Sequence, residues 1–227
     1  MKVQVILVAA GSGTRLKASK PKALVLLNGQ PLIWYSLKAF ERSKLVSSVI
    51  VVAHPDHLAS FRKVVDKASF KKVCAITPGG ETRSDSVACG LCCVDKNTEV
   101  VMVHDAARPL ITQKMIMDSL AVMGAQQAAI VAVPVKATIK KADPKNLFVT
   151  ETLLRETLWE VQTPQTFRRN ILDQAHQKKL CCDPTDDAML VEKMGVKVKV
   201  VAGDYKNIKV TTAEDLALAK LFMAKSG

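Results

Sequence analysis

Short, almost continuously apolar runs recur along the chain, each rich in β-branched residues. They cover residues 3–8, 49–53, 73–77, 100–104, 130–135 and 196–201. A strand with one solvated face alternates apolar and polar residues, whereas a strand covered on both faces does not. These runs therefore predict the strands of a parallel sheet that is buried on both faces.

Helical periodicity fills three of the intervals between these runs, at residues 31–42, 54–68 and 211–225. The third stretch begins with Thr211 and Glu214 in Thr-x-x-Glu spacing, which predicts a capping box at the helix start. Because strands and helices alternate, the predicted class is α/β with right-handed crossovers.

Residues 134–160 interrupt this alternation. Their sequence, "PVKATIKKADPKNLFVTETLLRETLWE", predicts two polar strands around the turn "ADPKN". A hairpin with so little apolar surface has to lie on the parent domain or on a partner chain. No repeat, low-complexity tract or long linker divides the chain. We therefore expect a single domain over residues 1–227, with this segment as a projecting arm.

The composition agrees with an α/β domain that has a sizeable core, since 48% of the 227 residues are hydrophobic. No apolar run approaches the roughly 18 residues of a membrane-spanning helix, and the first residues lack the features of a signal peptide. The six cysteines are Cys74, Cys89, Cys92, Cys93, Cys181 and Cys182. One CxxC spacing has no second half, so we expect reduced thiols and a cytoplasmic protein rather than a zinc or redox site.

The net charge of +12 comes from 33 Lys and Arg against 21 Asp and Glu. Such an excess suits a polyanionic partner, either nucleic acid or a phosphorylated small molecule. Aromatic residues make up only 4% of the chain, which argues against a stacking platform for single strands. The basic residues are also scattered, so charge by itself favours a lysine-rich solvated surface.

The segment that leaves the first predicted strand combines small residues with positive charge. It reads "AAGSGTRLKASKPKAL" at residues 9–24. Gly11 and Gly13 let a ligand approach the backbone, whose N–H groups bind phosphate in such loops. The segment contains neither a Walker motif nor a dinucleotide fingerprint. With Arg15 and Lys22 nearby, it predicts a triphosphate site in which fixed cations stabilise charge that grows during a reaction.

Two further segments place polar groups next to glycines or at a strand end. In "PGGETRSDSVACGL" at residues 78–91, two glycines precede Ser84 and Ser86, which can open a helix. The N-terminus of this predicted helix suits a phosphate or the edge of a base. The alternative is an ordinary capped helix without a ligand. In "VVMVHDAARPL" at residues 100–110, the strand ends at His104-Asp105, where open parallel sheets bind ligands. An aspartate there can orient a metal–triphosphate or a sugar hydroxyl, while we expect the histidine to be structural.

A fourth segment, "NIKVTTAEDL" at residues 207–216, puts Lys209 in a predicted short strand before the last helix. Together with "GGETRSDSV", "VHDAARP", "TPQTF" and the loop at residues 9–24, it resembles, in order, the motifs of the 2-C-methyl-D-erythritol 4-phosphate cytidylyltransferases. The resemblance runs from about residue 3 to about residue 223. It implies a Rossmann-like, mostly parallel sheet flanked by helices, with a β-hairpin arm at about residues 134–160 that embraces a second subunit in a homodimer.

The resemblance implies a reaction as well. CTP and 2-C-methyl-D-erythritol 4-phosphate, a polyol phosphate, give 4-diphosphocytidyl-2-C-methyl-D-erythritol and pyrophosphate in the non-mevalonate pathway to isoprenoid precursors. The nucleophile is the substrate's phosphate, mostly a dianion at neutral pH because its second pKa is near 6. No general base is required. Mg²⁺ or another divalent cation is implied, held mainly by the CTP triphosphate, with protein metal ligands unknown.

Roles follow from matching positions. Arg15 and Lys22 match the pair that stabilises the transition state. The positions matching CTP contacts are Ala9, Ala10, Gly11, Gly13, Gly80, Glu81, Ser86 and Lys209. The positions matching polyol phosphate contacts are Asp105, Thr138, Arg155, Thr163 and Lys209, with Thr138 and Arg155 offered by the partner's arm. Glu81 stands where some relatives have aspartate, and Ala23 replaces the glutamine common after Pro-Lys.

Three alternatives remain open. A ribitol 5-phosphate cytidylyltransferase shares the loop and the fold, although "HDAARP" and "NIKVTT" are more similar to the methylerythritol branch. A nucleic-acid-binding protein would explain the charge but not the two glycine loops and Asp105. A catalytically idle interaction module would not need Arg15, Lys22 and Lys209. The prediction is an enzyme without nucleic-acid or membrane partners.

Overall fold

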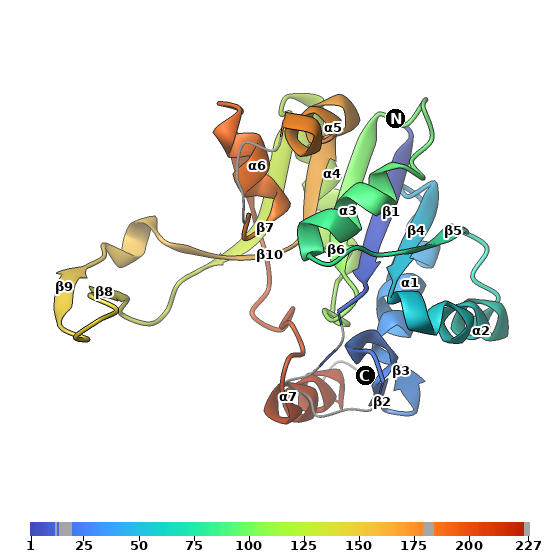
Figure 1. Cartoon of the computed structure of the whole chain (residues 1–227), viewed down its shortest axis with the longest axis horizontal. Coiled ribbons are helices and arrows are strands. Elements are labelled where there is room, and N and C mark those ends of the chain that lie inside the picture. The colour runs from blue at the N-terminus through green and yellow to red at the C-terminus, as the bar shows by residue number, and fades with distance from the viewer. Residues whose placement is uncertain (12, 14–19, 179–183, 225–227) are drawn as a thin grey trace.

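A seven-stranded sheet forms the centre of the computed structural model, which describes residues 1–11, 13, 20–178 and 184–224 (Figure 1). The strands lie in the order β11-β7-β10-β6-β1-β4-β5. Their bounds are β1 Val3–Ala9, β4 Ser48–Ala53, β5 Val73–Pro78, β6 Val100–Asp105, β7 Ala128–Pro134, β10 Trp159–Arg168 and β11 Val198–Ala202. Neighbours are parallel except around β10, which runs antiparallel to β6 and β7. The predicted α/β class and mostly parallel sheet are confirmed.

The six predicted strands correspond to six of these seven, and β10 was not predicted. Its sequence, "WEVQTPQTFR", carries polar residues at buried positions, among them Gln162, Gln165 and Thr166. Each has a specific partner; Gln162, for example, donates from Nε2 to the carbonyl oxygen of Asp204 at 2.9 Å. Hydrogen bonding between distant segments therefore buries a strand that lacks an apolar pattern.

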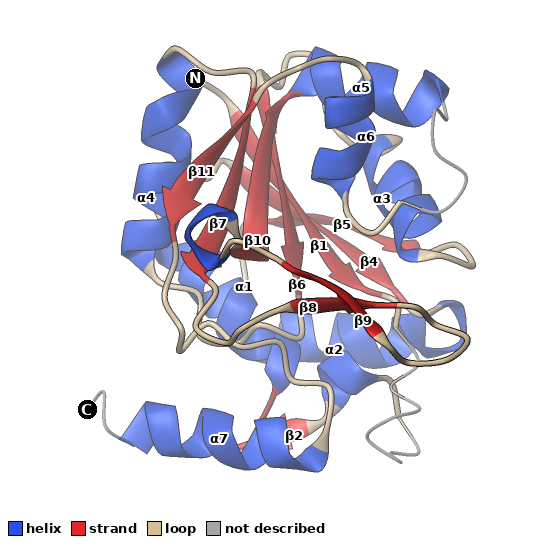
Figure 2. Cartoon of the chain, turned by 90° about the vertical axis from the view of Figure 1, so that its left-hand side faces the viewer, coloured by secondary structure: helices blue, strands red, loops and turns tan. Residues whose placement is uncertain are grey.

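Helices cover both faces of the sheet (Figure 2). The α-helices are α1 Leu32–Arg42, α2 Leu58–Ala68, α3 Arg83–Leu91, α4 Gln113–Ala121, α5 Arg169–Lys178, α6 Asp187–Lys193 and α7 Ala213–Ala224. The 3-10 turns are η2 Lys22–Leu24, η3 Pro55–His57, η4 Val122–Gly124 and η5 Arg155–Thr157. Val5 and Leu7 of β1 pack with α1, α2 and α4, whereas Ile6 packs with α3, α5 and α6. This alternation is the two-sided burial that the apolar runs predicted.

The last helix packs away from the main sheet, on the small hairpin of β2 Leu26–Leu27 and β3 Gln30–Pro31. Two predictions in this region were wrong. Lys209 lies in an irregular segment rather than in a short strand. The capping box uses Thr212 and Asp215 rather than Thr211 and Glu214: the Thr212 backbone N–H donates to Asp215 at 2.9 Å, and the Asp215 N–H donates to the Thr212 hydroxyl at 3.3 Å.

The predicted arm is present between β7 and β10. It holds the antiparallel strands β8 Lys140–Ala142 and β9 Val149–Thr152, which form a separate two-stranded sheet. Figure 1 shows it projecting from the edge of the molecule. At its tip, Leu147 and Phe148 are 79% and 74% exposed. Over the described residues, no helix is both long enough and apolar enough to cross a membrane.

Candidate active site

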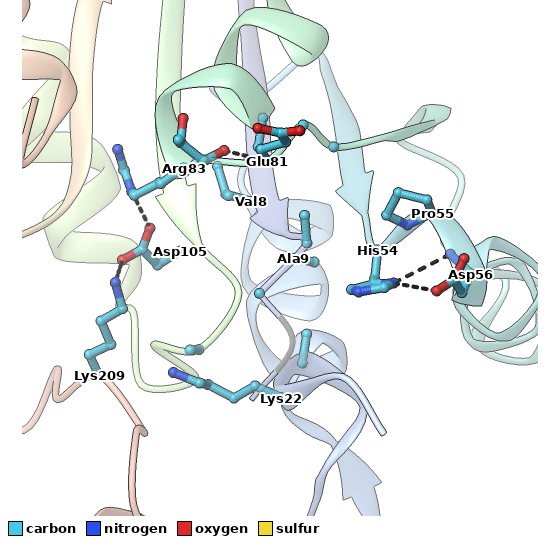
Figure 3. A pocket seen from close by; sticks show the side chains of 18 residues that line it. Val8, Ala9, Lys22, His54, Pro55, Asp56, Glu81, Arg83, Asp105 and Lys209 are labelled. Atoms are coloured by element: carbon cyan, nitrogen blue, oxygen red, sulfur yellow. Dashed lines mark hydrogen bonds and ion pairs between the residues drawn. The ribbon is translucent and has the colours of Figure 1, made fainter. Parts of the chain in front are cut away.

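A cavity of about 620 Å³ lies at the carboxyl ends of the parallel strands (Figure 3). The ends of β1 and β6 and the segments after β4 and β5 contribute to its lining. The described residues that line it are Val8, Ala9, Ala10, Gly11, Lys22, Ala23, His54, Pro55, Asp56, Gly79, Gly80, Glu81, Thr82, Arg83, Ser86, Asp105, Ala107 and Lys209. This edge is where open parallel sheets bind ligands, and the volume suits a small molecule.

Two glycines after β5 bring the loops of the cavity into close contact. A Cβ on Gly79 would lie 2.5 Å from the Cβ of Ala10, and one on Gly80 would lie 2.4 Å from the Cβ of Asp85. The helix that follows begins at Arg83, with Thr82 as its N-cap in a capping box with Asp85. The helix predicted at this segment is therefore present, but its N-cap is Thr82 rather than a serine. Backbone N–H groups at this N-terminus give the cavity a wall suited to an anion.

The first glycine loop positions Lys22. Gly13 has a positive φ of 76°, and a Cβ there would lie 2.9 Å from the backbone nitrogen of Lys22. Gly13 thus packs behind Lys22 and is not among the described lining residues, whereas Lys22 itself lines the cavity at the start of η2. Arg15, predicted to act with Lys22, lies outside the described residues.

Asp105, the last residue of β6, is held between two cations. Lys209 Nζ lies 2.7 Å from its Oδ2, and Arg83 Nε lies 3.1 Å from its Oδ1. Burial raises the pKa of the Asp105 carboxyl, but the charges of Arg83 and Lys209 outweigh burial and hold it well below its usual range. The aspartate is therefore an anion at neutral pH, fixed in orientation through both oxygens.

Arg83 also reaches a second carboxylate, because its Nη1 lies 2.7 Å from Oδ2 of Asp187 at the start of α6. Burial lowers the pKa of Arg83, but Asp105 and Asp187 together raise it above its ordinary value. Neither Arg83 nor Asp187 was predicted from the sequence to have a role. These two residues are 104 positions apart, so no local pattern signals their contact.

The histidine before Asp105 is buried and has a hydrogen-bond partner at each ring nitrogen, which agrees with the structural role expected for it. His104 is fully buried, with Nε2 3.2 Å from the carbonyl oxygen of Arg108 and Nδ1 2.8 Å from the hydroxyl of Thr163. A carbonyl only accepts, so Nε2 carries the proton and Nδ1 accepts from Thr163. Burial is the main cause that lowers the pKa of His104 to about 4. Thr163 in turn accepts from the Asp105 N–H at 3.1 Å, which connects β10 to the cavity.

A family profile described as IspD, 2-C-methyl-D-erythritol 4-phosphate cytidylyltransferase, matches residues 3–225. The chain belongs to this cytidylyltransferase family. Its relatives include 2-C-methyl-D-erythritol 4-phosphate cytidylyltransferases from Caldanaerobacter subterraneus, 44% identical over 99% of this chain and 100% of the relative, and from Pelotomaculum thermopropionicum, 46% identical over 96% and 93%. The chain is therefore a nucleotidyltransferase.

Solved structures agree with this assignment to the cytidylyltransferase family. The 4-diphosphocytidyl-2C-methyl-D-erythritol synthase of Anaerococcus prevotii superposes with a TM-score of 0.86 at 28% identity, covering 98% of both chains. The 2-C-methyl-D-erythritol 4-phosphate cytidylyltransferase of Thermus thermophilus gives 0.79 at 29% identity, covering 99% of this chain and 100% of the other. The fold expected from the sequence is thus the fold of the family.

The structure brings most of the predicted cytidylyltransferase residues together. The cavity lining includes Ala9, Ala10, Gly11, Lys22, Gly80, Glu81, Ser86, Asp105 and Lys209. Thr163 contributes behind the lining, through Asp105. Thr138 and Arg155 lie on the arm and are not among the described residues that line this chain's own cavity. His54 and Asp56, which were not predicted from the sequence, line the cavity directly after β4.

The described residues contain no group of three His, Cys, Asp or Glu side chains arranged to hold a metal ion. Both oxygens of Asp105 already pair with cations. Carboxylates of Asp56 and Glu81 also line the cavity, and hard oxygen ligands of this kind suit Mg²⁺. The lining therefore fits a cation that arrives with a triphosphate better than one caged by the protein alone.

Proposed function

We propose that this cytidylyltransferase joins CTP and 2-C-methyl-D-erythritol 4-phosphate. A phosphate oxygen of the polyol phosphate attacks the α-phosphorus of CTP, and the bond from the α-phosphorus to the bridging oxygen breaks. The products are 4-diphosphocytidyl-2-C-methyl-D-erythritol and pyrophosphate. The observation that supports this most is Asp105, held between Lys209 and Arg83 across the cavity from Lys22.

CTP occupies the part of the cavity bounded by the two glycine loops. Ala9, Ala10 and Gly11 leave β1 with little side chain, so that backbone N–H groups face the nucleotide. Gly80, Glu81 and Ser86 form the opposite wall at the start of α3. This arrangement needs few side chains, because backbone groups and a helix N-terminus hold phosphates and base edges directly.

Catalysis in this proposal consists of positioning and charge stabilisation. Lys22 stabilises the negative charge that develops on the α-phosphate and the leaving pyrophosphate, and Arg15 is assigned the same role from its matching position in the sequence. Lys209 holds a substrate phosphate, and Asp105 orients the hydroxyls of the polyol. No proton has to be removed from the nucleophile, since a phosphate monoester is mostly a dianion at neutral pH, with a second pKa near 6.

A divalent cation accompanies the triphosphate, and we propose that it is Mg²⁺. Mg²⁺ prefers oxygen ligands and keeps several waters when phosphates bind it. It would neutralise the triphosphate, while Asp56, Glu81 and Asp105 supply negative charge near it. Removal of divalent cations with excess chelator should abolish turnover, and full activity under those conditions would contradict this choice.

The arm supports a homodimer with shared sites. Thr138 and Arg155 lie on a segment that projects from its own chain. Arg155 is exposed, and its Nη1 donates to the carbonyl oxygen of Lys136 at 3.2 Å. Apolar side chains at the tip are also exposed. We propose that each arm places these two residues at the cavity of the other chain.

We also propose that residues 1–227 form one nucleotidyltransferase domain. The cytoplasmic location of the protein stays a prediction.

The experiment that tests this function compares polyol phosphates. Pyrophosphate release is measured with CTP and Mg²⁺, and with either 2-C-methyl-D-erythritol 4-phosphate or ribitol 5-phosphate. We expect kcat/KM for the methylerythritol substrate to exceed that for ribitol 5-phosphate by at least about 100-fold, since a polyol whose hydroxyls do not match the site leaves buried polar groups of the protein unpaired. Equal or reversed values would replace this proposal by the ribitol alternative.

A further inference from the structure

Asp187 is a buried carboxylate outside the cavity lining. Its side chain is 1% exposed at the start of α6. Oδ2 lies 2.7 Å from Arg83 Nη1, and Oδ1 lies 3.2 Å from Nε2 of His176 on α5. Its backbone N–H donates to Oε1 of Gln165 on β10 at 3.2 Å. Three elements therefore hold this residue in place, and both oxygens of its carboxylate have partners.

Arg83 connects this buried carboxylate to the cavity. One guanidinium group contacts two aspartates, through Nε to Asp105 at 3.1 Å and through Nη1 to Asp187 at 2.7 Å. In Figure 3, the Arg83 side chain lies above Asp105 and is joined to it by a dashed line, and Lys209 approaches the same carboxylate from the opposite side. Because a guanidinium is planar and its donors keep a fixed fork, two carboxylate partners determine its orientation.

Ion pairs connect the two carboxylates of this network to Arg83 and Lys209. Asp105 and Asp187 carry two negative charges, and Arg83 and Lys209 carry two positive charges. Loss of the Asp187 charge would leave Arg83 with a single carboxylate partner and with a net positive charge at the cavity wall. The guanidinium would then be able to turn, so that two of its nitrogens donate to Asp105 or so that it donates to a bound phosphate. Either movement changes the carboxylate that faces the substrate.

We propose that Asp187, supported by His176, is a positioning residue that orients Arg83 and, through it, Asp105 toward the polyol phosphate. This inference rests on the proposed function, in which Asp105 orients the polyol hydroxyls. It assigns Asp187 an effect on one substrate. A merely structural role, such as joining α6 to α3, would lower stability without distinguishing between the two substrates.

The test compares Asp187→Asn with Asp186→Asn as a matched control. Asp186 is the neighbouring N-cap of α6, does not contact Arg83, and bonds to Met189 and Gln165 instead. We expect Asp187→Asn to raise KM for 2-C-methyl-D-erythritol 4-phosphate about tenfold, the scale for loss of a charge-assisted hydrogen bond. KM for CTP should stay within about twofold. Asp186→Asn should change both KM values by less than about twofold.

A second variant and a second readout keep the test decisive. His176→Leu removes the other support of Asp187 and should raise the same KM by a smaller factor, which serves if Asp187→Asn does not fold. The NMR signal of the Arg83 Nε–H reports orientation without any substrate. Its exchange with solvent should accelerate at least about tenfold in Asp187→Asn and remain as in wild type in Asp186→Asn.

The outcomes separate this inference from the proposed function. If wild type releases no pyrophosphate with the methylerythritol substrate, the proposed function fails, and the Arg83 signal alone decides whether Asp187 orients Arg83. If wild type is active but Asp187→Asn changes neither the polyol phosphate KM nor the Arg83 signal, the positioning role is wrong. Equal increases in both KM values would also overturn it and leave Asp187 a structural residue.

Discussion

Lys209 Nζ lies 2.7 Å from Oδ2 of Asp105, joining the irregular segment before α7 to the end of β6. The two residues are far apart in the sequence, and their contact forms one side of the cavity (Figure 3). An ammonium has three donors, and Asp105 uses one of them. Lys209 can therefore keep Asp105 ionised and still donate to a substrate phosphate, which is the double role that the proposed reaction requires.

The first prediction concerns the charge at the end of the first glycine loop. Lys22→Ala should lower kcat by about 100-fold or more, the scale for loss of one preorganised stabilising group. CTP affinity should weaken less, because the backbone contacts remain. Steady-state kinetics with calorimetric CTP binding measures both effects. Lys20→Ala, which removes an exposed lysine two positions earlier, is the matched control. A kcat within about twofold of wild type in Lys22→Ala would exclude Lys22 as the stabilising group.

The second prediction concerns Gly13 and its contact with Lys22. Gly13→Ala places a Cβ 2.9 Å from the Lys22 backbone nitrogen at a positive φ. We expect a loss of about 1–2 kcal/mol in the free energy of unfolding, the range for an L-residue in the left-handed region. Gly11→Ala is the control for stability, since nothing lies within 4 Å of a Cβ there. Equal melting temperatures of the two variants would show that Gly13 is not constrained as described.

The third prediction uses the lowered pKa of His104, about 4 in the folded chain against 6.5 ordinarily. The unfolded chain binds a proton more readily than the folded chain, so stability is present above about pH 6.5 and is lost as pH falls toward about pH 4. Denaturant unfolding should show that this histidine lowers the free energy of unfolding by about 2 kcal/mol when the pH falls from about 7 to about 5. His104→Gln should lose less over the same interval. An identical pH dependence in both proteins would show that His104 titrates normally.

The fourth prediction tests the shared site. Arg155→Ala should raise KM for the polyol phosphate much more than KM for CTP, because a guanidinium fork suits a phosphate. Lys145→Ala, at the exposed tip of the arm, is the matched control. When Arg155→Ala and Lys22→Ala chains form mixed dimers, one site is intact and the other carries both changes. Activity should then recover to about half of wild type per mixed dimer. Mixed dimers that form without recovery would place both residues in one chain's site.

Sequence patterns predicted the parallel strands because each is an apolar run whose burial needs no partner-specific bonds. They failed at β10, where Gln162 and Gln165 are buried by hydrogen bonds to segments far away in sequence. The glycine loops and the end of β6 were predictable because strand ends converge at one edge of a sheet. The Arg83–Asp187 contact was not, since an ion pair between side chains 104 positions apart leaves no spacing to recognise. The segment after β4, with His54, carries too weak a local signal to be assigned to the cavity.

The central claim is transfer of the cytidylyl group, and the fate of labelled phosphorus tests it most directly. CTP labelled at the α-phosphorus or at the γ-phosphorus is incubated with the protein, Mg²⁺ and 2-C-methyl-D-erythritol 4-phosphate, and the products are separated. The account predicts that the α label appears in the organic product, that the γ label appears in pyrophosphate, and that both amounts are equal. A γ label in the organic product, or release of inorganic phosphate in place of pyrophosphate, would contradict it.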